Sequence, residues 1–229
     1  ISAILPMHTF GFMSRISEII SICNSWGIPC VEDSAEALGS HSQGKYAGSF
    51  GSFGAFSFNG NKIITAGGGG AIVSNDSILA DKAKHLTTTA KKSHTYEYFH
   101  DEIGYNYRMP NLNAALLLAQ LEQLENFIES KSNIYKEYLR YFESNLKEIK
   151  LVPIPESTTR WNFWLISVKL DNREQRDLFL KETNGRGVMT RPIWQLMYKL
   201  PMYSKCQRDD QLNAQVLEDT IVNVPSSSK

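Results

Sequence analysis

Residues 56–70 read FSFNGNKIITAGGGG and place a single lysine, Lys62, between a strand-like segment and four consecutive glycines. One interpretation is a surface lysine beside a flexible loop. The other is an amine held at the floor of a site, where glycines form a tight turn and let the backbone pass close to a bound molecule. The residues on either side of this stretch decide between the two interpretations.

The first 33 residues have the pattern of a strand, a helix and a second strand. Residues 1–5 (ISAIL) and 28–33 (IPCVED) are short apolar runs, and between them apolar residues recur with helical spacing over 16–26. This βαβ order predicts a parallel sheet, and ligands of such sheets bind at the carboxyl ends of the strands. Asp33 stands at one of these ends.

Ser14 and Gly27 are the expected N-cap and C-cap of that first helix. The pattern predicts further strands at 54–58, 62–66, 71–74 and 161–170, helices at 76–85, 114–142 and 173–184, a loop over 96–110, and an irregular carboxyl-terminal tail. A helix of about 30 residues often links two domains. We therefore expect one domain over 1–125 and a smaller α/β domain over 126–229.

The composition narrows the class of protein. Of the 229 residues 42% are hydrophobic, and 24 basic side chains balance 24 acidic ones, which disfavours a nucleic-acid-binding protein. The three cysteines form no C-x-x-C pair, so we expect buried, reduced thiols in a cytoplasmic protein and no metal site. No apolar run has the length of a membrane span.

Polar groups suited to one cofactor gather in the first 110 residues. Lys62 offers an amine that can attack an aldehyde, and Asp33 offers a carboxylate that can face a protonated ring nitrogen. Ser57 and the glycine-rich turns offer phosphate ligands. Together they match the requirements of a pyridoxal phosphate site. Taken alone, Lys62 would be interpreted as an ordinary surface lysine and Asp33 as a turn residue.

Three segments carry a resemblance to a known family: VEDSAEALGS (31–40), GSFGAFSFNGNKIITAGGGGAIVSND (51–76) and HDEIGYNYRMPNLNAALLLAQLEQL (100–124). They resemble the DegT/DnrJ/EryC1 nucleotide-sugar aminotransferases, which are fold-type I pyridoxal phosphate enzymes with an aspartate-aminotransferase-like α/β fold. In that fold, residues 1–125 resemble the latter part of the large domain. The family's large domain has about a hundred or more residues ahead of this point, so we expect the amino-terminal part to be missing here.

The resemblance assigns roles residue by residue. Lys62 matches the lysine that binds the cofactor's aldehyde covalently and moves protons, and Asp33 matches the carboxylate facing the ring nitrogen. Ser57 matches a phosphate ligand. Asn106 matches an asparagine that reaches the phosphate of the partner subunit in the family's homodimers. Glu36 stands where many relatives have glutamine or histidine near the cofactor's hydroxyl.

Three further residues resemble substrate-binding positions. His8 matches a segment beside the active site, although a hydrogen-bonded structural histidine is the simpler interpretation. Arg108 and Arg191 are candidates to anchor the amino donor's carboxylate or the nucleotide diphosphate. Trp161, Trp164 and Trp194 are interpreted as core or interface aromatics.

The branch that this sequence resembles transfers an amino group from glutamate to a UDP-linked 4-keto-6-deoxy sugar, for bacterial lipopolysaccharide or other surface polysaccharides. Two functions remain open: that reaction, or a non-catalytic fragment that keeps the fold and dimer contacts. A related dehydratase is discounted, because those relatives replace the lysine with histidine and Lys62 is present.

Overall fold

The computed structural model describes residues 1–145 and 149–228. They form two compact units, one of residues 1–129 with 154–164 and one of residues 130–153 with 165–229. The expected division at residue 125 stays a prediction, and residues 146–148 and 229 of the expected second domain lie outside the described residues.

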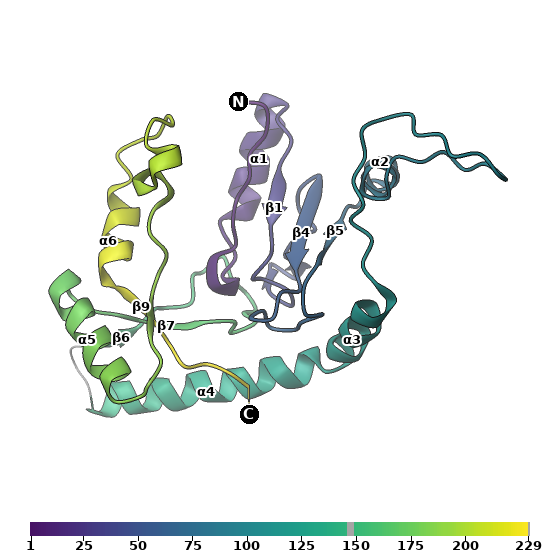
Figure 1. Cartoon of the computed structure of the whole chain (residues 1–229). Coiled ribbons are helices and arrows are strands. Elements are labelled where there is room, and N and C mark those ends of the chain that lie inside the picture. Colours follow the sequence, from purple (N-terminus) through teal and green to yellow (C-terminus); the bar gives the residue numbers. More distant parts are fainter. Residues whose placement is uncertain (146–148, 229) are drawn as a thin grey trace. The chain divides into compact units, whose positions relative to one another are not determined.

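The first unit contains a three-stranded sheet in the order β1 (Val31–Asp33), β4 (Phe53–Ser57), β5 (Gly70–Val73) (Figure 1). β1 and β4 are parallel, and β4 and β5 are antiparallel. The expected strand over 1–5 is not formed as such: Ile4 and Met7 make only isolated parallel bridges, to Cys30 and Asp33. Their parallel direction still confirms the predicted parallel arrangement.

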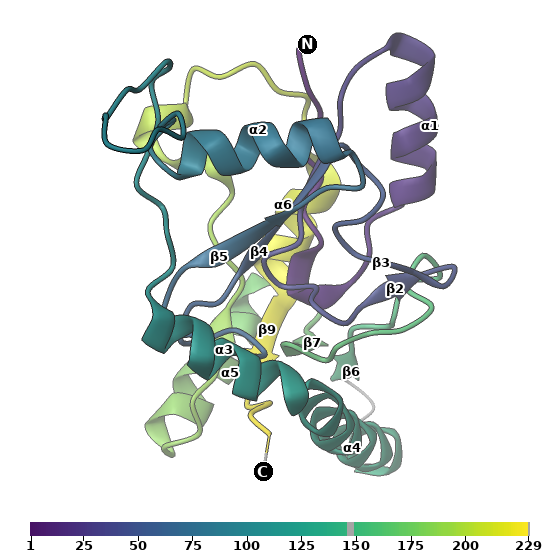
Figure 2. The same ribbon diagram turned by 90° about the vertical axis from the view of Figure 1, so that its right-hand side faces the viewer.

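Two helices accompany this sheet, α1 (Ile16–Trp26) and α2 (Ser77–Thr87), and α2 lies against β5 (Figure 2). Gly27 ends α1 in the left-handed conformation, as predicted. The prediction of Ser14 as N-cap was wrong. Arg15 holds that position without a side-chain bond, because the amide and hydroxyl of Ser14 both contact Nδ1 of His8.

Two other expectations for this unit were wrong. Residues 62–66 form turns instead of a strand. The helix expected over 114–142 is two helices, α3 (Asn111–Glu122) and α4 (Leu124–Asn145), separated at Gln123. The break has a packing consequence: Leu117 of α3 and Phe127 of α4 both contact one buried cluster.

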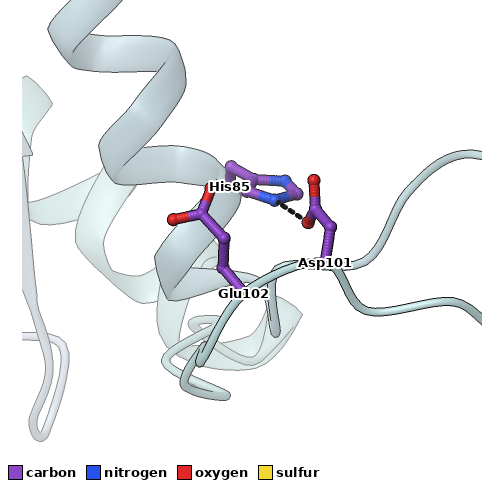
Figure 3. A group of neighbouring side chains, drawn as sticks. All are labelled: His85, Asp101 and Glu102. Carbon is purple, nitrogen blue, oxygen red and sulfur yellow. Dashed lines mark hydrogen bonds and ion pairs between the residues drawn. The ribbon is translucent and has the colours of Figure 1, made fainter.

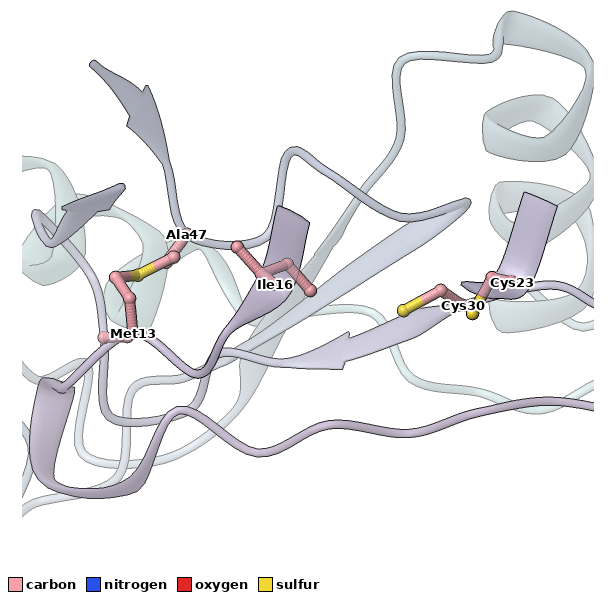
Figure 4. Close-up of a cluster of buried hydrophobic side chains, with 6 residues drawn as sticks. Met13, Ile16, Cys23, Cys30 and Ala47 are labelled. Atoms are coloured by element: carbon pink, nitrogen blue, oxygen red, sulfur yellow. The ribbon is translucent and has the colours of Figure 1, made fainter. Parts of the chain in front are cut away.

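That cluster consists of Phe58, Ile64 and Ala66, each less than 5% exposed. It anchors the turn that carries Lys62, since Ile64 lies two residues further along the chain. A second cluster, formed by Met13, Ile16, Cys23, Cys30, Ala37 and Ala47, packs α1 against the start of β1 (Figure 4). The expectation of three buried thiols was wrong for Cys206, which is exposed. The first unit also holds a short hairpin, β2 (His41–Ser42) and β3 (Lys45–Tyr46), and the 3-10 turn η1 (Thr9–Gly11).

The second unit is an antiparallel sheet in the order β6 (Lys150–Leu151), β7 (Ile166–Lys169), β9 (Ile221–Val224), β8 (Arg191–Pro192). It also contains α5 (Arg173–Gly185), α6 (Leu212–Thr220), η2 (Met197–Lys199) and η3 (Pro201–Tyr203). The tail expected to be irregular therefore includes a helix and a strand. β9 is stabilised by pairing with β7 and by burial of Val222, which local sequence does not reveal. Among the described helices, none is both long and apolar enough to cross a membrane.

Candidate active site

The carboxyl ends of β1 and β4 carry the first two candidate residues. Because the strands are parallel, with Asp33 opposite Ala55, Asp33 and Ser57 lie at the same edge of the sheet. Oδ1 of Asp33 accepts a hydrogen bond of 3.1 Å from the amide of Ala35, which holds the carboxylate in a turn. The βαβ pattern predicted this position for Asp33.

Lys62 follows β4 in a turn closed by its amide, which donates to the carbonyl of Asn59. Its side chain is only 13% exposed, and Nζ lies 3.7 Å from Oε1 of Glu36. Nζ also lies over the indole ring of Trp164, 4.5 Å from the ring centroid. The amine is therefore enclosed by one carboxylate and one aromatic face. This excludes the interpretation of Lys62 as an ordinary surface lysine.

Glu36 is nearly buried, and its Oε2 accepts a 2.7 Å hydrogen bond from the amide of Phe10. Burial raises the pKa of the Glu36 carboxyl, and the Phe10 hydrogen bond and the charge of Lys62 only partly oppose that shift. The charge of Asp33 raises it further. Glu36 thus lies beside Lys62, and its carboxyl ionises less readily than that of an exposed glutamate.

A second buried carboxylate, Glu32, fixes the strand that carries Asp33. It accepts hydrogen bonds from the amides of Gly48, Phe50 and Gly51 at 2.6–2.9 Å, and its Oε2 lies 3.0 Å from Nε2 of His8. Burial raises the pKa of Glu32, but the bonds from His8 and the three amides outweigh it and lower the pKa overall.

His8 has no exposed surface in this arrangement. The structure gives it contacts with Glu32 and Ser14, and its role in substrate binding stays a prediction.

The segment between α2 and α3 carries the next candidates and projects beyond α2 in Figure 1. The guanidinium of Arg108 donates to the carbonyl of Thr88 at 2.9 Å and to Oδ1 of Asn106 at 3.3 Å. Arg108 and Lys84 also line a cavity of about 880 Å³, together with Gly67–Gly70. Arg191 lies exposed in β8, within the second unit.

The sequence did not reveal the contribution of residues 161–164 to this site. Nδ2 of Asn162 donates to the carbonyls of Glu36 and Leu38, and Nε1 of Trp164 donates to the carbonyl of Asn61. The two tryptophans in WNFW were the available signal, but they were interpreted as core or interface aromatics. A sequence separation of about 100 residues concealed their connection to Lys62.

Another polar group lies where α2 meets the projecting segment. His85, Asp101 and Glu102 bring their ligand atoms within 4.8 Å of one another (Figure 3). The carboxylates already have partners: Lys82 pairs with Glu102, and Lys92 lies 3.5 Å from Asp101. The hydrogen bond from His85 lowers the pKa of Asp101. These contacts describe an ion-pair network that anchors the segment.

Known proteins are similar to this chain in both sequence and fold. A profile of the DegT/DnrJ/EryC1/StrS aminotransferase family matches residues 1–229. The putative pyridoxal phosphate-dependent aminotransferase EpsN of Bacillus subtilis is 36% identical over 201 residues, and GDP-perosamine synthase of Escherichia coli O157:H7 is 36% identical over 203 residues. The alignments cover 88% and 89% of this chain, but 51% and 54% of the relatives.

Among solved structures, Helicobacter pylori PseC, an aminotransferase involved in the biosynthesis of pseudoaminic acid, has a TM-score of 0.92 at 24% identity. That match covers 99% of this chain and 62% of PseC. The fold is thus that of the fold-type I pyridoxal phosphate enzymes, as predicted. The chain belongs to the DegT/DnrJ/EryC1/StrS aminotransferase family, and it spans about half the length of the relatives it matches.

Proposed function

We propose that this protein takes part in pyridoxal phosphate-dependent transamination of a nucleotide-linked keto sugar. The observation that carries the proposal is the nearly buried amine of Lys62, 3.7 Å from Glu36 and next to the sheet edge that holds Asp33 and Ser57. Such an amine–carboxylate arrangement in a family of aminotransferases suits covalent binding of an aldehyde.

The residues present fit the cofactor chemically. Pyridoxal phosphate, when bound, supplies an aldehyde for amine attachment and a ring that withdraws electrons from the reacting carbon. Lys62 would bond to the aldehyde carbon through Nζ with loss of water. Once the substrate's amine had displaced it from that carbon, the freed Nζ would carry the substrate's proton. Asp33 would hold the proton on the ring nitrogen, Ser57 would donate its hydroxyl to the phosphate, and Glu36 would keep Lys62 in place.

The substrate proposal is a UDP-linked 4-keto-6-deoxy sugar, with glutamate as the amino donor. Arg108 and Arg191 are the proposed anchors for the donor's carboxylate or for the diphosphate, because both are exposed cations with several donors. GDP-perosamine synthase, a 36% identical relative, has a GDP-linked sugar in its name. A comparison of UDP and GDP substrates is therefore part of the test.

We also propose a homodimer in which Asn106 of one copy reaches the phosphate site of the other. The projecting segment supports this, because Tyr96, Tyr98, Ile103 and Tyr107 are each more than 70% exposed. Exposed apolar side chains gathered in one segment are typical of a protein interface. The proposed setting is the biosynthesis of lipopolysaccharide or another surface glycan, in the cytoplasm.

The first test is a visible absorbance spectrum after incubation with pyridoxal phosphate and desalting, followed by borohydride reduction and mass spectrometry. We expect a retained band and a reduced adduct on Lys62, both absent in Lys62→Ala. Lys45→Ala is the matched control, since Lys45 also lies over an aromatic ring, that of Phe50, at 4.7 Å.

Retention of the band in Lys62→Ala would contradict the role of Lys62. No band in the unmodified chain would favour the alternative, a non-catalytic fragment that keeps the fold. If the band is present, amino transfer from glutamate to UDP- and GDP-linked keto sugars tests the substrate.

A further inference from the structure

Trp164 contacts both Lys62 and the residue that precedes it. The ring lies 4.5 Å from Nζ of Lys62, and its Nε1 donates a 2.8 Å hydrogen bond to the carbonyl of Asn61. The side chain is 3% exposed, so the ring face meets the amine in a largely dehydrated environment. A cation over an indole face is stabilised by the ring's negative face, and more strongly when water is excluded.

The same short segment also holds Glu36, the other neighbour of the amine. Asn162 is fully buried, and its Nδ2 donates to the carbonyl of Glu36 at 2.7 Å. Its Oδ1 accepts a 3.0 Å hydrogen bond from the amide of Trp164. One side chain therefore links the backbone of Glu36 to that of Trp164 and fixes the separation of the groups on both sides of Lys62.

The backbone between Asn162 and Trp164 is strained. Phe163 has a φ of 55°, in the left-handed region that a bulky residue rarely adopts. Phe10, whose amide donates to the carboxylate of Glu36, has a φ of 58°. Strained residues persist where the surrounding contacts fix them, and they gather at functional sites. Here both occur in segments that contact Glu36.

We propose that Trp164 is a positioning residue: its indole face holds the amine of Lys62 beside Glu36 whenever the amine is not bonded to a cofactor. The inference rests on the proposed function, in which Lys62 alternates between a free and a bonded amine. The amine would otherwise be free to turn away from Glu36, because the lysine side chain has four rotatable bonds and loses entropy when it is fixed.

The test measures the reactivity of Lys62 without any cofactor. Competitive acetylation with acetic anhydride at pH 7, read by mass spectrometry, gives the rate at Lys62 relative to the exposed Lys45. In Trp164→Leu we expect Lys62 to react about fivefold faster, since the cation–π contact that covers and holds the amine is lost. In Trp164→Phe, which keeps an aromatic face, we expect a change within about twofold.

Trp161→Leu is the matched control. Trp161 has the same exposure of 3% and lies in the same segment, but its Nε1 donates to the carbonyl of Phe10 instead of Asn61. An equal increase in Trp161→Leu, or an unchanged rate in a folded Trp164→Leu, overturns the proposal. Circular dichroism establishes that each variant is folded.

A second measurement does not depend on the folding of the leucine variant. Lys62→Met removes the cation from the ring, so the tryptophan fluorescence of the otherwise unmodified protein should change. The same substitution in a Trp164→Phe background should leave the fluorescence unchanged, and an equal change in both backgrounds overturns the proposal. Both measurements omit pyridoxal phosphate, so a missing absorbance band contradicts the proposed function without altering these readouts.

Discussion

Nζ of Lys62 and Oε1 of Glu36 are 3.7 Å apart, in a site where the lysine side chain is 13% exposed and the glutamate side chain 4% exposed. Burial raises the pKa of Glu36 despite the nearby lysine. The folded protein therefore resists ionisation of Glu36 more strongly than the unfolded chain does, and the contribution of this carboxyl to stability depends on pH.

We predict that the stability of the Glu36→Gln variant, relative to that of the unmodified protein, increases as pH rises. A raised folded pKa means that the Glu36 contribution is complete below about 4.5, the unfolded value, and is lost as pH rises through the folded pKa. Thermal melts at pH 4 and pH 7.5 should show the melting temperature of the variant, minus that of the unmodified protein, increasing by a few degrees. A difference that is the same at both pH values contradicts the prediction; Glu97→Gln, at an exposed site, is the control.

Glu32→Gln should destabilise the first unit by about 3 kcal/mol at neutral pH. An amide cannot accept all the hydrogen bonds from His8, Gly48, Phe50 and Gly51, so buried donors would lose their partner. Because the folded pKa of Glu32 is lowered, its stabilisation is present above about 4.5 and is lost as pH falls through the folded pKa. Urea unfolding at pH 7 and pH 4 should show that the deficit, the unfolding free energy that the variant lacks relative to the unmodified protein, is smaller at pH 4. A deficit that grows in acid would show that the carboxylate is not the stabilising form.

The four glycines that follow the Lys62 turn should not tolerate alanine equally. A Cβ at Gly70 would overlap the carbonyl oxygen of Phe56 in the neighbouring strand, whereas nothing lies within 4 Å of a Cβ at Gly68. We expect Gly70→Ala to cost roughly 2 kcal/mol or more and Gly68→Ala to stay within about 0.5 kcal/mol. Urea denaturation of both variants measures the difference; equal effects would show that β5 lies further from β4.

Because of Lys131, the second unit should be more stable in mild alkali than at neutral pH. Its Nζ donates to the carbonyl of Ser226, and burial lowers the pKa of the amine to about 8 from 10.5. Between these values the unfolded chain binds more protons than the folded one, so stability rises with pH, by up to about 3 kcal/mol. Unfolding free energies at pH 7 and pH 9.5 should show about 2 kcal/mol of this gain in the unmodified protein and none of it in Lys131→Met. The same gain in the variant would assign the effect to other groups.

The three thiols should differ sharply in reactivity. Cys206 is exposed and should react within minutes with a disulfide reagent at pH 8, while Cys23 and Cys30 should react only after unfolding. Burial, with smaller contributions from the neighbouring Cys23 and Glu32, raises the pKa of Cys30 to about 12. Counting released thiolate before and after adding denaturant should give one and then three thiols; three at once would show that the α1–β1 cluster opens readily.

Much of the fold could be predicted because its signals are local. The helix α1 and the strand β1 that follows it, the Gly27 cap and the helices that begin near Asp76 and Arg173 each depend on residues within a few positions of one another. The family resemblance was confirmed as well. The resemblance also singled out Lys62, for which the local stretch alone left open a surface lysine or an amine at the floor of a site.

The sequence alone thus determined the family, the α/β class and a short list of candidate groups. Tertiary structure decided how those groups meet: it paired Lys62 with Glu36, buried His8 against Glu32, and broke the long helix at Gln123. It also brought Trp164 to a lysine about 100 residues away in the chain. The physical reason is that side-chain burial, ion pairing and strand pairing depend on distances in space, whereas a periodic pattern records only neighbours along the chain.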